Sequence, residues 1–108
     1  MKLFEIRMKV KPGPDAPEGV TQALTCCFAS AEDYGQAVGN ALNEAQLRGI
    51  EVEDVLSPVR ELSKARWAEY VQTTWPEHVA SFPTQAEIGA LVDAQSVFFG
   101  PFVGYPGA

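Results

Sequence analysis

Apolar and charged residues alternate at the start of the chain. Odd-numbered charged positions face away from the even-numbered apolar positions, which are Phe4, Ile6, Met8 and Val10. A period of two predicts a strand over residues 2–11 with one buried face, as is typical of antiparallel sheets. Residues 12–17 contain three prolines and a glycine, so a loop ends the strand. The pattern then predicts a second strand over residues 20–29, paired antiparallel with the first.

A helical spacing of apolar residues follows the second strand. Its members recur at i, i+3, i+4 and i+7, and they are Tyr34, Ala37, Val38, Ala41, Leu42 and Ala45. This spacing predicts a helix, with Ser30 as its N-cap, Asp33 three residues later and Gly49 just after its end. Because small residues form its apolar face, we expect this helix to lie close to the sheet.

The second half of the chain predicts two further strands. Residues 50–62 lose the period of two at Val55 and Leu56 and contain Pro58, which predicts a bulge or an edge position. The last strand, over residues 96–103, is apolar at both sets of alternate positions, which predicts cover on both faces.

Two helices are predicted between these strands. Ser63 is suited to cap the first helix, and Pro76 disfavours helical geometry at the residue before it. A short turn is expected after Pro76. Thr84 and Glu87 then form a capping box that predicts the start of the second helix.

The predicted fold class is α+β, in a single domain over residues 1–108. The elements follow the order β-β-α-β-α-α-β, which differs from the order of the ferredoxin-like fold. We expect a two-layer sandwich, with a mixed, mostly antiparallel four-stranded sheet and helices on one face.

Charge and cysteine content restrict the functional classes. The formal net charge is −6, which disfavours binding to nucleic acid and to anionic membrane surfaces. The N-terminus lacks the pattern of a signal peptide, and no apolar stretch approaches the roughly 20 residues that span a bilayer. The two cysteines are adjacent, so they do not form a disulfide framework, and we expect a cytoplasmic location.

Few residues are candidates for catalytic or metal chemistry. Cys26 and Cys27 are thiol candidates with His78, the only histidine, as a possible base, although packing in the core is the favoured interpretation. One histidine without spaced cysteines does not predict a zinc site, and an acidic cluster at residues 51–54 is better explained as a solvated strand edge. No catalytic motif is present, and we predict no catalytic residue, cofactor or metal.

An aromatic cluster offers the strongest candidate binding surface. The candidate binding residues are Trp67, Tyr70, Trp75, His78 and Tyr105. Tryptophan and tyrosine favour interfaces and ligand pockets because they bury a large area and keep a polar group. The alternative is that these residues form the core of the fold.

The sheet also raises the question of association. If all helices cover one face, the other face lacks cover within the chain, and packing against a second copy would supply it. We therefore expect a homodimer that packs sheet against sheet.

Three functional hypotheses are compatible with these patterns. The favoured one is a non-catalytic protein-binding module, of the class of small acidic inhibitor, immunity-type or regulatory proteins, with an unidentified protein partner. The second is a small enzyme or ligand-binding domain with an aromatic pocket near Trp75 and His78. The third is a subunit of a larger assembly. Whether catalysis occurs is undecided at this level, and the absence of a motif favours a non-enzyme.

Overall fold

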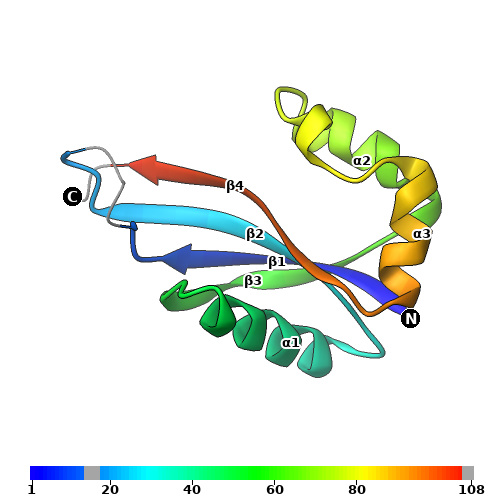
Figure 1. Cartoon of the computed structure of the whole chain (residues 1–108), viewed down its shortest axis with the longest axis horizontal. Helices are drawn as coiled ribbons and strands as arrows, with labels where there is room; N and C mark the ends of the chain where they lie inside the picture. The colour runs from blue at the N-terminus through cyan, green and yellow to red at the C-terminus, as the bar shows by residue number, and fades with distance from the viewer. Residues whose placement is uncertain (14–17, 106–108) are drawn as a thin grey trace.

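A computed structural model describes residues 1–13 and 18–105 of the chain, which form a four-stranded sheet with three α-helices and two short 3-10 helices. The elements in chain order are β1 (Lys2–Val10), β2 (Gln22–Ala31), α1 (Tyr34–Leu47), β3 (Val52–Leu62), η1 (Lys64–Arg66), α2 (Trp67–Thr74), η2 (Val79–Ser81), α3 (Gln85–Asp93) and β4 (Val97–Tyr105) (Figure 1). The α+β class and the predicted order of elements are confirmed. The strands are arranged in the order β3-β1-β2-β4.

All three neighbouring pairs of strands are antiparallel, which corrects the expected mixed sheet. The reason lies in the connections. Helix α1 returns the chain along the sheet, so β3 has the same direction as β2. Because β3 pairs with β1 and not with β2, it is antiparallel to its neighbour. Helices α2 and α3 stay at the end of the sheet where β3 finishes. Strand β4 therefore starts at that end and runs against β2.

Helix α1 covers one face of the sheet through small residues. Ala37, Ala41 and Ala45 on its inner side are fully buried. The first two pack with the even-numbered apolar residues of β1, which the alternation had placed on the buried face. Alanine allows the helix axis to approach the strands closely, so the predicted close packing is confirmed.

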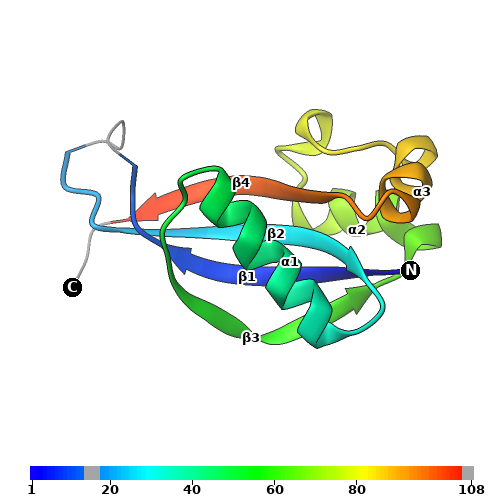
Figure 2. The same ribbon diagram turned by 60° about the horizontal axis from the view of Figure 1, so that its bottom comes forward.

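Helices α2 and α3 lie on the opposite face, so the prediction that all helices cover one face is wrong (Figures 1 and 2). A second core forms there between the sheet and these helices. It consists of Leu3, Cys26, Phe28, Trp67, Val71, Phe82, Ile88 and Val92. The helices are held on this face by the ring of Phe28, which contacts the rings of Trp67 and Phe82 at centroid distances of 5.4 and 5.7 Å. The large aromatic residues of this segment need a buried surface, and α1 already occupies the other face.

The ends of the helices test the predicted caps. Strand β2 continues through Ser30, whose hydroxyl donates to the Ser96 carbonyl at 3.2 Å, so Ser30 is not the N-cap. Asp33 caps α1 instead, because its side chain accepts from the Gln36 amide at 2.8 Å. Both hydrogen bonds of the capping box between Thr84 and Glu87 are present, as predicted. Glycine 49 has a φ of 72°, in agreement with its predicted place after α1.

The two edge strands differ in chemistry. Strand β3 lies at an edge and shows two irregularities in its register with β1, as predicted. Strand β4 forms the other edge, and Phe102 and Val103 are each 51% exposed, so the prediction that this strand is covered on both faces is wrong. Helices α2 and α3 lie at the end of the sheet near Phe28, so on their face they leave the second half of β4 uncovered (Figure 1). No helix in the described part of the chain is long and apolar enough to cross a membrane.

Candidate functional site

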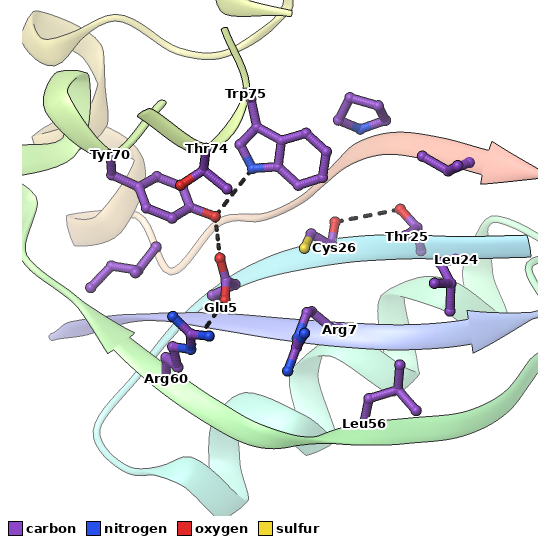
Figure 3. A pocket seen from close by; sticks show the side chains of 13 residues that line it. Glu5, Arg7, Leu24, Thr25, Cys26, Leu56, Arg60, Tyr70, Thr74 and Trp75 are labelled. Carbon is purple, nitrogen blue, oxygen red and sulfur yellow. Dashed lines mark hydrogen bonds and ion pairs between the residues drawn. The ribbon is translucent and has the colours of Figure 1, made fainter. Parts of the chain in front are cut away.

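A cavity of about 450 Å³ lies on the face of the sheet opposite α1, beside the last turn of α2 (Figure 3). It exists because α2 and α3 cover only one end of that face. All four strands contribute to what we call the sheet cavity. Its apolar walls are Leu24, Leu56, Leu62, Pro101, Val103 and the indole of Trp75. Its principal polar groups are Glu5, Arg7, Arg60, Tyr70 and Thr74.

Glu5 is the buried charge of the sheet cavity. It sits in the middle of the central strand β1, between Phe28 of β2 and Arg60 of β3, and is only 4% exposed. The hydroxyl of Tyr70 donates a hydrogen bond to Oε2 of Glu5. Its other oxygen, Oε1, is 3.9 Å from Nε of Arg60. A buried carboxylate requires such partners because removing it from water is costly.

Trp75 completes a line of polar groups across the cavity. Its Nε1 donates to the Tyr70 hydroxyl oxygen at 3.2 Å, and that hydroxyl donates in turn to Glu5 (Figure 3). Burial is the main cause that raises the pKa of Tyr70 above its ordinary value, and the hydrogen bond to Glu5 acts in the same direction. Tyr70 is therefore a neutral donor that fixes both the carboxylate and the indole.

Arg7 forms the floor of the cavity. It is paired with Cys26 on one side and with Leu56 on the other, and all three residues line the cavity. One terminal nitrogen, Nη2, donates to the carbonyl of Ser57 at 3.4 Å. Its Nε is buried, and no residue of the described chain provides a hydrogen-bond partner for it. Protein atoms cover Nε, so the donors of Arg7 that a molecule in the cavity can reach are its terminal nitrogens.

The two cysteines point to opposite faces of β2. Cys26 lines the sheet cavity, whereas Cys27 belongs to the core beneath α1. Both thiols are buried and free. Burial raises the pKa of each thiol to about 12, so both remain protonated at neutral pH and neither is an activated nucleophile. Packing, which the sequence favoured, explains their places in the structure.

The predicted binding residues separate into distinct environments. Tyr70 and Trp75 meet in the sheet cavity. Trp67 is fully buried in the second core, where its Nε1 donates to the carbonyl of Pro83 at 2.8 Å. His78 is exposed and does not line the cavity, although its ring is 6.4 Å from that of Trp75. Tyr105 ends β4, and its side chain lies outside what the structure describes.

Three charged residues of the site escaped prediction. The alternation in the first strand placed Glu5 and Arg7 on a solvent-facing side, and Arg60 lay in a strand with broken periodicity. The available signal was indirect: aromatic residues gather in the second half of the chain and need a buried surface. Within residues 1–13 and 18–105, no group of three or more His, Cys, Asp or Glu side chains is arranged to hold a metal ion.

Comparison of the chain with protein-family models, with curated proteins and with solved structures found no match. What the cavity can bind is therefore inferred from the residues that line it. A mostly apolar cavity with one fixed carboxylate, one neutral phenol and two guanidinium groups is suited to hold and orient a small organic molecule.

The hydrogen bond between Tyr70 and Glu5 predicts an energetic coupling between these two residues. Tyr70→Phe should lower the free energy of unfolding by about 1–3 kcal/mol, because it leaves a buried carboxylate without its main donor. In a Glu5→Leu background the same change should cost less, because only the hydrogen bond from Trp75 is then lost. Urea unfolding of the four proteins measures the coupling.

Tyr34→Phe is the control for this cycle, since the Tyr34 side chain is exposed on α1. It should change stability by no more than about 0.5 kcal/mol. An equal cost of Tyr70→Phe in both backgrounds would show that the carboxylate does not depend on the phenol.

The buried thiols predict a loss of stability in alkali. Their pKa of about 12 in the folded chain exceeds the ordinary value of 9.0, so above pH 9 the unfolded chain releases protons that the folded chain keeps. The contribution of the protonated thiols to the free energy of unfolding is complete below pH 9. It is lost between pH 9 and 12, at up to about 1.4 kcal/mol per pH unit for each thiol. The free energy of unfolding, measured with urea at pH 8 to 11, should therefore decline less steeply with pH in a Cys26→Ala, Cys27→Ala protein than in the natural protein. Parallel declines would contradict the assignment.

Proposed function

We propose that this protein binds a small organic molecule with an apolar body in the sheet cavity. The observation that carries the proposal is the cavity itself, whose volume of about 450 Å³ falls within the range of roughly 300–1,000 Å³ typical of ligand sites. Its walls are mainly aliphatic side chains and one indole. Such a surface stabilises a ligand by excluding water from it, and a few polar groups fix its orientation.

The polar groups of the cavity favour binding over turnover. One oxygen of Glu5 accepts from Tyr70 and the other faces Arg60, so the carboxylate is held by its neighbours. The thiol of Cys26 is protonated, with a pKa of about 12. The proposal corresponds to the ligand-binding alternative that the sequence predicted near Trp75, without His78 as a member of the site. The hypotheses of a protein-binding module, of a larger assembly and of a cytoplasmic location stay predictions.

A second candidate function is self-association through β4. This edge strand has no charged residue, whereas the opposite edge strand, β3, contains Glu53, Asp54, Arg60, Glu61 and Pro58. Charges and proline protect an edge against pairing with another chain, and β4 has Pro101 alone. The half exposure of Phe102 and Val103 favours burial against a partner. A second copy could pair β4 with β4 about a two-fold axis, which is a different contact from the predicted sheet-on-sheet dimer.

Ligand binding is tested with the neutral fluorescent probe N-phenyl-1-naphthylamine. Its fluorescence should rise at one saturable site per chain. Leu24→Trp fills the cavity from β2 and should weaken binding of the probe by about tenfold or more, equivalent to about 1.4 kcal/mol. The fluorescence of the probe, excited beyond the absorption of tryptophan, measures the affinity of each variant.

Leu47→Trp is the matched control, because Leu47 is exposed on α1 at the other face of the sheet. It adds the same side chain and should leave the affinity unchanged. The proposal fails if the probe does not bind the folded protein, or if both tryptophan variants weaken binding equally.

Self-association is tested by the mass of the protein in solution. Light scattering should give the mass of two chains for the natural sequence and of one chain for Phe102→Lys, because a buried charge at the edge opposes pairing. Lys64→Met, an exposed change far from β4, should keep the dimer. A monomeric natural protein would exclude this function and leave the ligand proposal intact.

A further inference from the structure

We infer that the ligand of the sheet cavity is an organic monoanion whose acidic group lies against the Arg7 guanidinium. The inference rests on the proposed function, since it names the chemical class of the molecule that the cavity binds. It depends on three properties of the cavity: an unused donor, a surplus of positive charge and an apolar surrounding.

The unused donor is Nη1 of Arg7, which makes no hydrogen bond to a described residue, whereas Nε of the same side chain is covered by protein atoms. The other buried polar groups around it are engaged, because Trp75 donates to Tyr70 and Tyr70 donates to Glu5. Arg7 is different: its only hydrogen bond to a described residue, from Nη2 to the carbonyl of Ser57, is long at 3.4 Å. An anionic acceptor supplied by a ligand would add charge-assisted hydrogen bonds to the terminal nitrogens.

The charge of the cavity is opposite in sign to the charge of the chain. Two arginines and one glutamate line it, which leaves a formal surplus of one positive charge in a protein of net charge −6. Tyr70 and Cys26 are neutral. One negative charge on the ligand balances this surplus. A dianion such as a phosphate monoester would carry an unbalanced charge beside the buried carboxylate of Glu5, which disfavours it.

The geometry of Arg7 suits a carboxylate in particular. The two terminal nitrogens of a guanidinium form a planar fork that matches the two oxygens of a carboxylate. Arg7 lies between Cys26 and Leu56 on the floor of the cavity, while Trp75 closes the side toward α2 (Figure 3). A ligand with its carboxylate on this floor would place a planar apolar body along the aliphatic walls and the indole.

The experiment compares two ligands of one shape that differ in charge. 1-Naphthoate is a monoanion and 1-naphthamide is its neutral counterpart, and each displaces N-phenyl-1-naphthylamine from the cavity. The natural protein should bind naphthoate at least about tenfold more tightly than naphthamide, because a charged partner roughly doubles the strength of a hydrogen bond. In Arg7→Met, which keeps the apolar stem, this preference should fall to about twofold or less.

Lys9→Met is the matched control. Lys9 is a cation on the same face of the same strand but does not line the cavity, so its removal should preserve the preference. Loss of the preference in both variants, or its persistence in Arg7→Met, would overturn the role of Arg7. The comparison of the two ligands in the natural protein needs no variant. It therefore still tests the inference if Arg7→Met does not fold.

The outcomes separate this inference from the function on which it rests. If the neutral probe binds but the natural protein prefers naphthamide, or binds both ligands equally, the cavity is a ligand site and the inference of a monoanionic ligand is wrong. If the neutral probe itself does not bind, the ligand-binding function fails and the inference fails with it.

Discussion

The contact between Phe28 and Trp67 determines where the helices end on the sheet, and the cavity depends on it. The two rings meet edge to face at 5.4 Å, and both side chains are fully buried. The indole nitrogen of Trp67 also binds the Pro83 carbonyl, which ties α2 to the segment that leads into α3. Both helices are thereby held at the end of the sheet near Phe28. The remaining half of that face stays uncovered by helices, and its side chains become the walls of the sheet cavity.

A charged residue in the middle of a central strand is a second constraint on this molecule. Burying Glu5 removes a carboxylate from water, and the gain from its partners is partly cancelled by that cost. An apolar residue would fill the same place between Phe28 and Arg60 without any such loss. Tyr70 of α2 and Arg60 of β3 instead contact the carboxylate, and Trp75, at the end of α2, donates to the Tyr70 hydroxyl. This group of polar side chains therefore places a charge at a position of the sheet where stability alone does not require one.

Local patterns predicted the elements well and their arrangement only in part. Alternation in β1, the alanine face of α1 and the capping box at Thr84 each depend on neighbouring residues, and all three were confirmed. The faces of the sheet depend on contacts between distant segments. Alternation shows that Glu5 and Phe4 lie on opposite faces of the sheet. It does not show that α2 returns to cover the face on which Glu5 lies. For the same reason Tyr70 and Trp75 were recognised as aromatic candidates, while their charged partners on β1 and β3 were not.

The adjacent cysteines give this fold a pair of built-in reporters. Cys26 lies in the wall of the cavity, and Cys27, the next residue, lies beneath α1. Isotopic labelling of cysteine alone would therefore produce two resonances, one for each side of the sheet, from a single dipeptide. A molecule entering the cavity would shift the first resonance and leave the second as an internal reference. The two layers would thereby be observed separately without the introduction of a foreign group.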